Sequence, residues 1–155
     1  MARFKMELPT EIIKQMETVN KNADKIFGEM TKAGAEVAAQ NMRANAPSDL
    51  QPYVRVGKTF KTPSDNGINT EAYVSGYIPF SDPNRKYFSR AGGNGKTYKT
   101  TLGVPAEFLA NLYEYGRSTS PFPKKPFLRK SFNKGQIEEA MLLAQAKASG
   151  GLLDE

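Results

Sequence analysis

The sequence predicts an α+β fold in which a long N-terminal helix and a C-terminal helix pack on a small antiparallel β-sheet with an extended hairpin. Three observations predict it. Apolar and small residues recur every three or four positions from 10 to 45, strand-like segments separated by turn signals follow from 53 to 102, and helical periodicity returns from 105 to 149. We expect a single domain over residues 1–155, because 155 residues can bury a core without disulfides.

The long helix is expected over residues 10–45, ending before Pro47. Its seam comprises Ile12, Met16, Val19, Ala23, Ile26, Met30, Ala33 and Val37, followed by the polar Asn41. At about 1.5 Å per residue, the rod is roughly 50 Å long, so part of it should protrude or lie across a neighbour. The alternative is two helices broken near Asn20-Lys21-Asn22 or at Gly28. Gly28 and Gly34 either permit a bend or close approach, or are simply tolerated.

Residues 53–60 and 69–78 predict an antiparallel strand pair, because a turn cluster ending in Asn66-Gly67 separates them. A second hairpin is expected around 86–88 and 96–100. Its basic residues, which alternate with aromatic ones, are Arg85, Lys86, Arg90, Lys96 and Lys99. Three readings stay open for them: a protected sheet edge, contact with nucleic acid, or contact with a partner protein. A phosphate-binding loop at Gly95-Lys96-Thr97 is rejected, because Arg90 occupies the position of the required first glycine.

The short helix at 105–115 should begin with Pro105, carry Glu107 in its first turn and end at Gly116. Phe108, Leu109, Leu112 and Tyr113 would form its apolar stripe. A basic elbow at 117–126 follows, held extended by three prolines. The C-terminal helix is expected over 126–149, with Phe127, Leu128 and Phe132 anchoring the elbow on the sheet. We expect Glu114 to pair with Arg117 or Arg129 and to fix the elbow angle.

These segments carry a family resemblance. Leu112-Tyr113-Glu114-Tyr115-Gly116, followed by Lys125-Pro126-Phe127-Leu128-Arg129, resembles the signature of tailed-bacteriophage head-to-tail joining and tail-completion proteins of the gene-product-ten-like type. Asn45-Ala46-Pro47 extends the resemblance to the first helix. The resemblance implies a structural virion protein that forms a ring at the neck. The interaction residues expected on this basis are Glu114, Gly116, Arg117, Lys124, Lys125, Pro126, Phe127, Arg129 and Lys130.

The amino-acid composition argues against an enzyme. The chain has neither cysteine nor histidine, which removes thiolate chemistry and the usual general base near neutral pH. Glu107 and Glu114 lie about two helical turns apart, which is too wide for a cooperating acid and base. We therefore expect no enzyme, cofactor or metal. No apolar run approaches the roughly 20 residues that span a bilayer, so no membrane association is expected.

The net charge of +6 is unevenly distributed. Residues 117–134 carry six basic and no acidic side chains, whereas 135–155 carry one basic and four acidic ones. The resemblance implies self-association into a ring, a hexamer in the virion and a monomer before assembly. It also implies contact with connector or head-closure and tail-tube or tail-terminator proteins, with assembly in the host cytoplasm. The alternative is a small basic nucleic-acid-binding domain, against which the balanced charge of the first helix argues.

Overall fold

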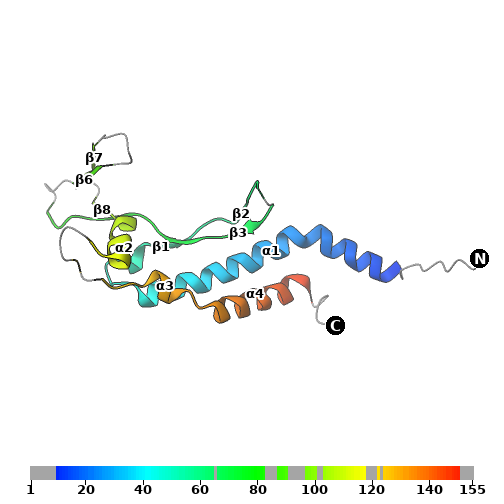
Figure 1. Ribbon diagram of the computed structural model, residues 1–155. Helices are drawn as coiled ribbons and strands as arrows, with labels where there is room; N and C mark the ends of the chain where they lie inside the picture. Colours follow the sequence, from blue (N-terminus) through cyan, green and yellow to red (C-terminus); the bar gives the residue numbers. More distant parts are fainter. Residues whose placement is uncertain are drawn as a thin grey trace, which may run out of the picture. The chain divides into compact units, whose positions relative to one another are not determined.

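The computed structural model describes residues 10–64, 66–82, 87–90, 97–100, 103–117, 122 and 124–150, and it confirms the α+β class. Side chains are described from Asn20 onward, except in the strands at 87–90 and 97–100. The helices are α1 (Thr10–Asn45), α2 (Ala106–Tyr115), α3 (Leu128–Ser131) and α4 (Lys134–Ser149), with a 3-10 turn at Gln51–Tyr53 (Figure 1). The strands are β1 (Val54–Val56), β2 (Phe60–Lys61), β3 (Ile68–Asn69), β4 (Ala72–Val74), β5 (Tyr77–Ile78), β6 (Tyr87–Arg90), β7 (Thr97–Thr100) and β8 (Val104–Pro105).

Helix α1 is one uninterrupted α-helix of 36 residues, so the alternative of two helices is wrong. It ends immediately before Ala46-Pro47, as the proline predicts. The described residues group into two compact units, one drawn from 10–37, 58–71 and 134–150 and the other from 38–57 and 72–133. Each unit is described separately, and the single-domain prediction stays a prediction.

In the first unit, α4 lies alongside α1 (Figure 1). Gly34 of α1 makes the close approach possible, since a Cβ built there would lie 3.0 Å from Met141 Cγ and 3.2 Å from Ile137 Cγ2. Gly28 has no comparable constraint, because its nearest neighbour would be Thr59 Cγ2 at 3.7 Å. Close packing therefore explains one of the two helical glycines.

A short hairpin completes the first unit. Phe60 pairs with Asn69 and Lys61 with Ile68, and Asn66 adopts a left-handed φ of 54° in the turn, as the Asn-Gly signal predicts. Thr70 Oγ1 lies 3.0 Å from Thr31 Oγ1 of α1, which ties the hairpin to the helix. An exposed ion pair between Lys61 and Asp24 at 3.2 Å adds a second tie.

The second unit contains the other three strand pairs, all antiparallel. β1 pairs with β4 through Val54–Val74, Arg55–Tyr73 and Val56–Ala72, and β6 pairs with β7 from Tyr87–Thr100 to Arg90–Thr97, so both predicted pairings are confirmed. The sequence reading missed β5–β8, in which Tyr77 pairs with Pro105 and Ile78 with Val104. Pro105 therefore ends a strand and precedes the helix, instead of being its first residue.

The core of the second unit contains the end of α1, β1, β4, α2 and the residue before α3. Its buried members are Ala39, Met42, Ala46, Leu50, Val54, Val74, Ala106, Ala110 and Phe127. The predicted seam of α1 is only partly right: Ile26 is buried, whereas Ala33, Val37 and Asn41 are half-buried. The small residues Ala35 and Ala39 of α1 are buried as well, although neither belongs to the predicted seam.

The predicted stripe on α2 is partly confirmed, because Leu109 and Tyr113 pack against the core, but the fully buried face is a different one. Its buried positions are Ala106, Ala110 and Glu114, four residues apart, while Phe108 is exposed. Two alanines bring α2 close to β8 and β4, and the same face continues into the carboxylate of Glu114. Hydrophobic periodicity could not find this face, because it contains small and charged residues instead of large apolar ones.

The predicted C-terminal helix over 126–149 is two helices. α3 ends at Ser131, and α4 begins at Lys134 after the non-helical Phe132 and Asn133. Phe127 is fully buried and Leu128 packs against the core, but Phe132 is 67% exposed. The prediction that Phe132 anchors the elbow is therefore wrong, since the break after α3 leaves it outside the core.

Candidate interaction site

The site is built around Glu114, a charged side chain with 0% exposure at the end of α2. One carboxylate oxygen, Oε2, accepts hydrogen bonds from the backbone N–H groups of Phe127 at 2.9 Å and Leu128 at 3.0 Å. The other, Oε1, accepts one from Arg129 Nε at 2.7 Å. Glu114 thus binds the first residues of α3, where backbone N–H groups have no partner within the helix. Of the two predicted partners, Arg129 is the one that the structure shows.

These hydrogen bonds keep a buried carboxylate ionised. Burial by itself raises the pKa of Glu114, but hydrogen bonds from Arg129 and from the backbone of residues 127–129 outweigh it and lower the pKa below its ordinary 4.5. In turn, hydrogen bonding to Glu114 and its negative charge raise the pKa of Arg129. Glu114 is therefore charged at neutral pH, and its hydrogen bonds join the end of α2 to the start of α3.

Two further contacts attach the elbow to α2. The backbone N–H of Lys125 donates to the carbonyl of Tyr113 at 2.9 Å, and the ring of Phe122 meets the ring of Tyr113 edge-on at 5.0 Å. Gly116 closes the helix with a φ of 80°, its N–H donating to the Leu112 carbonyl at 2.8 Å. The described ends of the elbow are therefore held against α2 by backbone as well as side-chain contacts.

The hydroxyl of Tyr113 makes a further contact, with Asp49. It donates to Asp49 at 3.4 Å, and burial, followed by the charge and hydrogen bond of Asp49, raises the pKa of Tyr113. Ser131 at the end of α3 is buried, and its hydroxyl lies 3.2 Å from the Asn41 carbonyl of α1. Sequence reasoning missed both ties, because a single aspartate or serine in a loop or short helix carries no distinctive pattern.

The outer side of this joint carries an aromatic ring among cations. Tyr115 is 67% exposed, and the Arg129 guanidinium lies 5.6 Å from the centre of its ring, a cation–π geometry. Arg117, Lys124 and Lys125 are exposed nearby in the chain. We call Tyr115, Arg117, Lys124, Lys125 and Arg129 the elbow surface. Tyrosine and arginine are enriched at energetically important positions of protein interfaces.

The structure brings together the central predicted residues Glu114, Gly116, Phe127 and Arg129. Pro126 is half-buried and Lys130 exposed beside them. The hairpin residues cannot be placed in a site: Arg85, Lys86 and Lys96 lie outside the described residues, and only the backbone is described for Arg90 and Lys99. The rejected phosphate loop also lies mostly outside the described residues.

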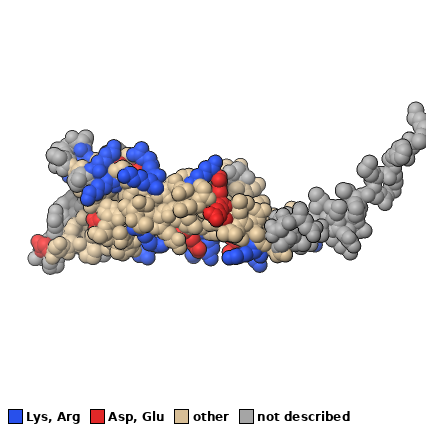
Figure 2. Space-filling view, turned by 90° about the horizontal axis from the view of Figure 1, so that it is seen from below, with Lys and Arg blue, Asp and Glu red and all other residues tan. Residues whose placement is uncertain are grey.

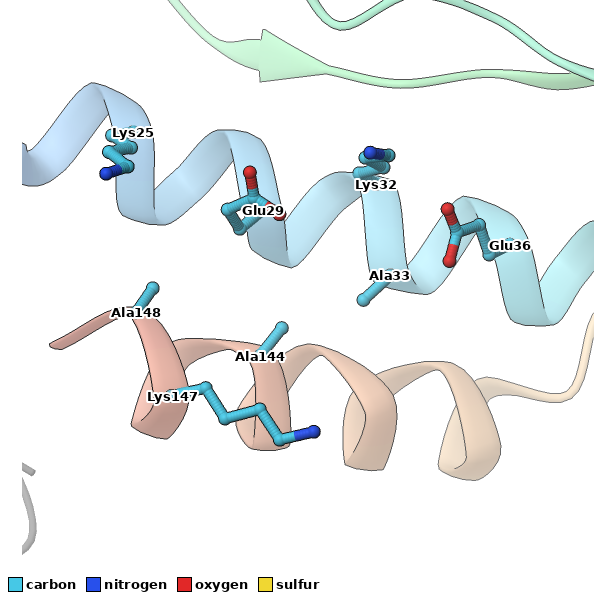
Figure 3. A pocket seen from close by; sticks show the side chains of 8 residues that line it. All are labelled: Lys25, Glu29, Lys32, Ala33, Glu36, Ala144, Lys147 and Ala148. Carbon is cyan, nitrogen blue, oxygen red and sulfur yellow. The ribbon is translucent and has the colours of Figure 1, made fainter. Parts of the chain in front are cut away.

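Each unit carries a groove. One, of about 340 Å³ in the second unit, has Met42, Val74, Ala110 and Leu128 in its lining, with Glu107 at its edge. The other, of about 420 Å³ in the first unit, lies between α1 and α4, and Figure 3 shows Ala33, Ala144 and Ala148 pointing into the space between the helices. Lys25, Glu29, Lys32 and Glu36 alternate in charge along its α1 side. Neither lining carries a cysteine or histidine.

Acidic residues do not converge at either place. Across the described residues, no group of three or more metal-binding side chains could hold an ion. On the face in Figure 2, basic side chains form one larger and several smaller groups, with acidic ones between them. Among the helices as far as they are described, none is both long and apolar enough to cross a bilayer.

Comparison with known families settles what kind of protein this is. The model of the family described as "Bacteriophage HK97-gp10, putative tail-component" matches residues 10–116. The chain belongs to this HK97 gp10-like family. No curated protein and no solved structure matches the chain. The family is one of structural components of phage tails, a class that is typically non-enzymatic.

The family match runs from α1 to Gly116, so the elbow, α3 and α4 lie beyond it. The structure nevertheless joins the two halves of the signature noted in the sequence. Glu114 belongs to the Glu-Tyr-Gly half, and its three hydrogen-bond donors are supplied by Phe127, Leu128 and Arg129 of the second half. A carboxylate at position 114 and the segment 126–129 therefore form one structural unit in this HK97 gp10-like protein.

Proposed function

We propose that this HK97 gp10-like chain completes the phage tail or joins head to tail, and that it acts as a ring at the neck. The observation that carries the proposal is the joint at Glu114, which holds the elbow surface in one orientation. A buried, fully bonded carboxylate fixes position, and an exposed tyrosine stacked with arginine offers a contact that loses little entropy when a partner binds.

The rest of the described surface supports this reading. Large apolar side chains at Phe27, Phe108, Phe132, Leu142 and Leu143 are exposed, and the face in Figure 2 carries both basic and acidic side chains. Apolar anchors with a charged rim are the usual composition of protein interfaces. The description of the family as a phage tail component supports a role that depends on contacts with other virion proteins.

In this proposal, copies made in the host cytoplasm stay monomeric until they meet the growing particle. They then form a ring, a hexamer around the tail axis, between the connector or head-closure proteins and the tail-tube or tail-terminator proteins. Closed rings are what identical subunits form when each uses two different surfaces and the rotation closes.

The experiment is deletion of the coding sequence from a phage or prophage that carries it, with complementation from a plasmid. We expect electron micrographs to show heads and tails that fail to join, or tails whose ends are abnormal. The wild-type chain supplied from the plasmid should restore the infectious yield. Glu114→Ala should restore poorly, whereas Glu107→Ala, which removes an exposed carboxylate from the same helix, should restore normally. Normal particles at full yield without the protein would disprove the role.

The alternative of a nucleic-acid-binding domain depends on hairpin cations whose side chains lie outside the described residues, so no described contact favours it. Retention on duplex DNA separates the two functions. A steep loss of retention with added salt, together with normal head-tail joining after deletion, would favour the alternative.

A further inference from the structure

Helix α4 is apolar on two opposite sides. Its inner side faces α1: Ile137 and Met141 lie beside Gly34, and Ala144 points toward α1 in Figure 3. At 100° per residue, Leu142 and Leu143 lie on the other side, and they are 62% and 58% exposed. A helix with apolar residues all round is normally buried all round. The outer side of α4 therefore presents two leucines that nothing in the described part of the chain covers.

Acidic side chains flank these leucines. Glu139 lies three and four residues before them, which places it on the same side of the helix, and it is exposed. Glu138 is exposed beside it and pairs with Lys134 at 3.5 Å. We call Glu138, Glu139, Leu142 and Leu143 the α4 outer face. It is apolar at its centre and negative at one end.

The elbow surface has the complementary character. It comprises the exposed ring of Tyr115, against which Arg129 lies, and the exposed cations Arg117, Lys124 and Lys125. The complementarity is local: the charged side chains of the elbow surface are all basic, whereas Glu138 and Glu139, the two acidic side chains of α4, flank Leu142 and Leu143, with Lys134 and Lys147 as the basic side chains of that helix. Two elbow surfaces would repel each other, as would two α4 outer faces. Each fits the other.

We propose that the elbow surface of one copy binds the α4 outer face of the next copy, head to tail. This deepens the proposed function and rests on it, since it names the contact that builds the ring. The contact joins two different surfaces, so each added copy offers a free elbow surface and a free α4 outer face until the ring closes. Exposed aromatic and leucine side chains supply the apolar contact, and lysine–glutamate pairs at the rim set orientation.

A cysteine trap tests the contact directly, because the chain has no cysteine of its own. Lys125→Cys and Glu139→Cys are introduced together, both at exposed positions, and oxidised with copper–phenanthroline. We expect a ladder of dimers, trimers and larger species on non-reducing gels that collapses to monomer with dithiothreitol. The matched control joins Lys125→Cys to Gln40→Cys, an exposed position on α1, and should give no ladder above dimer.

The trap is run on free protein at high concentration and on particles that carry the double-cysteine chain. A ladder in either sample supports the contact. A ladder in neither, an equal ladder in the control, or a fast-migrating monomer with an internal disulfide overturns it. Failure of the proposed function looks different: the chain would then be absent from particles and dispensable for head-tail joining, whatever the gels show.

Charge reversal gives an independent readout by sedimentation velocity, at a protein concentration raised until the wild-type chain self-associates. Lys124→Glu with Lys125→Glu, and separately Glu138→Lys with Glu139→Lys, should each weaken self-association at least tenfold. Mixing the two variants should restore it, since the reversed elbow of one binds the reversed helix of the other. Unchanged association of either variant alone, or no recovery on mixing, contradicts the proposal and points to a different virion protein as the occupant of these surfaces.

Discussion

Replacing Glu114 with alanine should destabilise the protein through a defined loss. The substitution removes the acceptor of three hydrogen bonds, two from backbone N–H groups at 2.9 and 3.0 Å and one from Arg129 at 2.7 Å. The N–H of Phe127 is buried, whereas that of Leu128 is only partly buried.

The magnitude follows from these contacts. A buried donor left without a partner costs about 1–3 kcal/mol, and hydrogen bonds to a charged group are at the upper end. Loss of the partner of Phe127 and weakening of that of Leu128 give about 3 kcal/mol in total for Glu114→Ala. For a chain of this size, about 1 kcal/mol corresponds to roughly 2–4 °C in melting temperature. The expected fall in Tm is therefore about 6–12 °C.

Glu114→Gln is the matched comparison. The amide oxygen can still accept from the two backbone N–H groups, but its NH₂ group then faces the Arg129 donor, so about 1–2 kcal/mol is lost. Glu107→Ala is the control for removing a carboxylate from α2, and because Glu107 is exposed its loss should cost under about 1 kcal/mol. Thermal unfolding followed by circular dichroism at pH 7 orders the four proteins. A Tm for Glu114→Ala within 2 °C of wild type would refute the reasoning.

Four further predictions follow from the same contacts. Because the folded-state pKa of Glu114 is depressed, its stabilisation is complete above about pH 4.5 and is lost as pH falls through the folded value, so the Tm gap to Glu114→Gln should close in acid; a constant gap down to pH 2 would contradict this. Between about pH 5.5 and 8, where no ordinary side chain of this histidine- and cysteine-free chain titrates, light scattering during assembly should stay flat, and a step near pH 6.5 would be evidence against it. Gly28→Ala should raise Tm, because alanine favours the helix by about 1 kcal/mol over glycine. The Tm of Gly34→Ala should be at or below that of wild type, because the added Cβ would meet Met141 at 3.0 Å. Equal gains in Tm would show that α4 adjusts freely. Gly116→Ala should cost about 1 kcal/mol in urea unfolding, from its φ of 80° alone, since no atom lies within 4 Å of the added methyl; an unchanged midpoint would count against strain there.

The elements with strong local signals could be predicted from the sequence alone. The hydrophobic periodicity and Pro47 predicted the bounds of α1, the Asn66-Gly67 turn predicted the β2–β3 hairpin, and Gly116 predicted the end of α2. These features depend on backbone preferences of a few adjacent residues, so no distant contact is needed to specify them. The charge segregation of the last forty residues and the lack of cysteine and histidine are likewise properties of the chain itself.

Tertiary structure decided the rest. Only packing could choose Ala106, Ala110 and Glu114 as the buried face of α2 over the larger residues beside them, because close approach of backbones favours small side chains. Only folding could select Arg129 over Arg117 as the partner of Glu114 and add the N–H groups of α3, since those donors lie 13 to 15 positions away along the chain. The sequence by itself determined which charges the elbow carries. The buried carboxylate of Glu114 determines where the elbow holds them, because a buried ionised carboxylate is stable only where hydrogen-bond donors surround it.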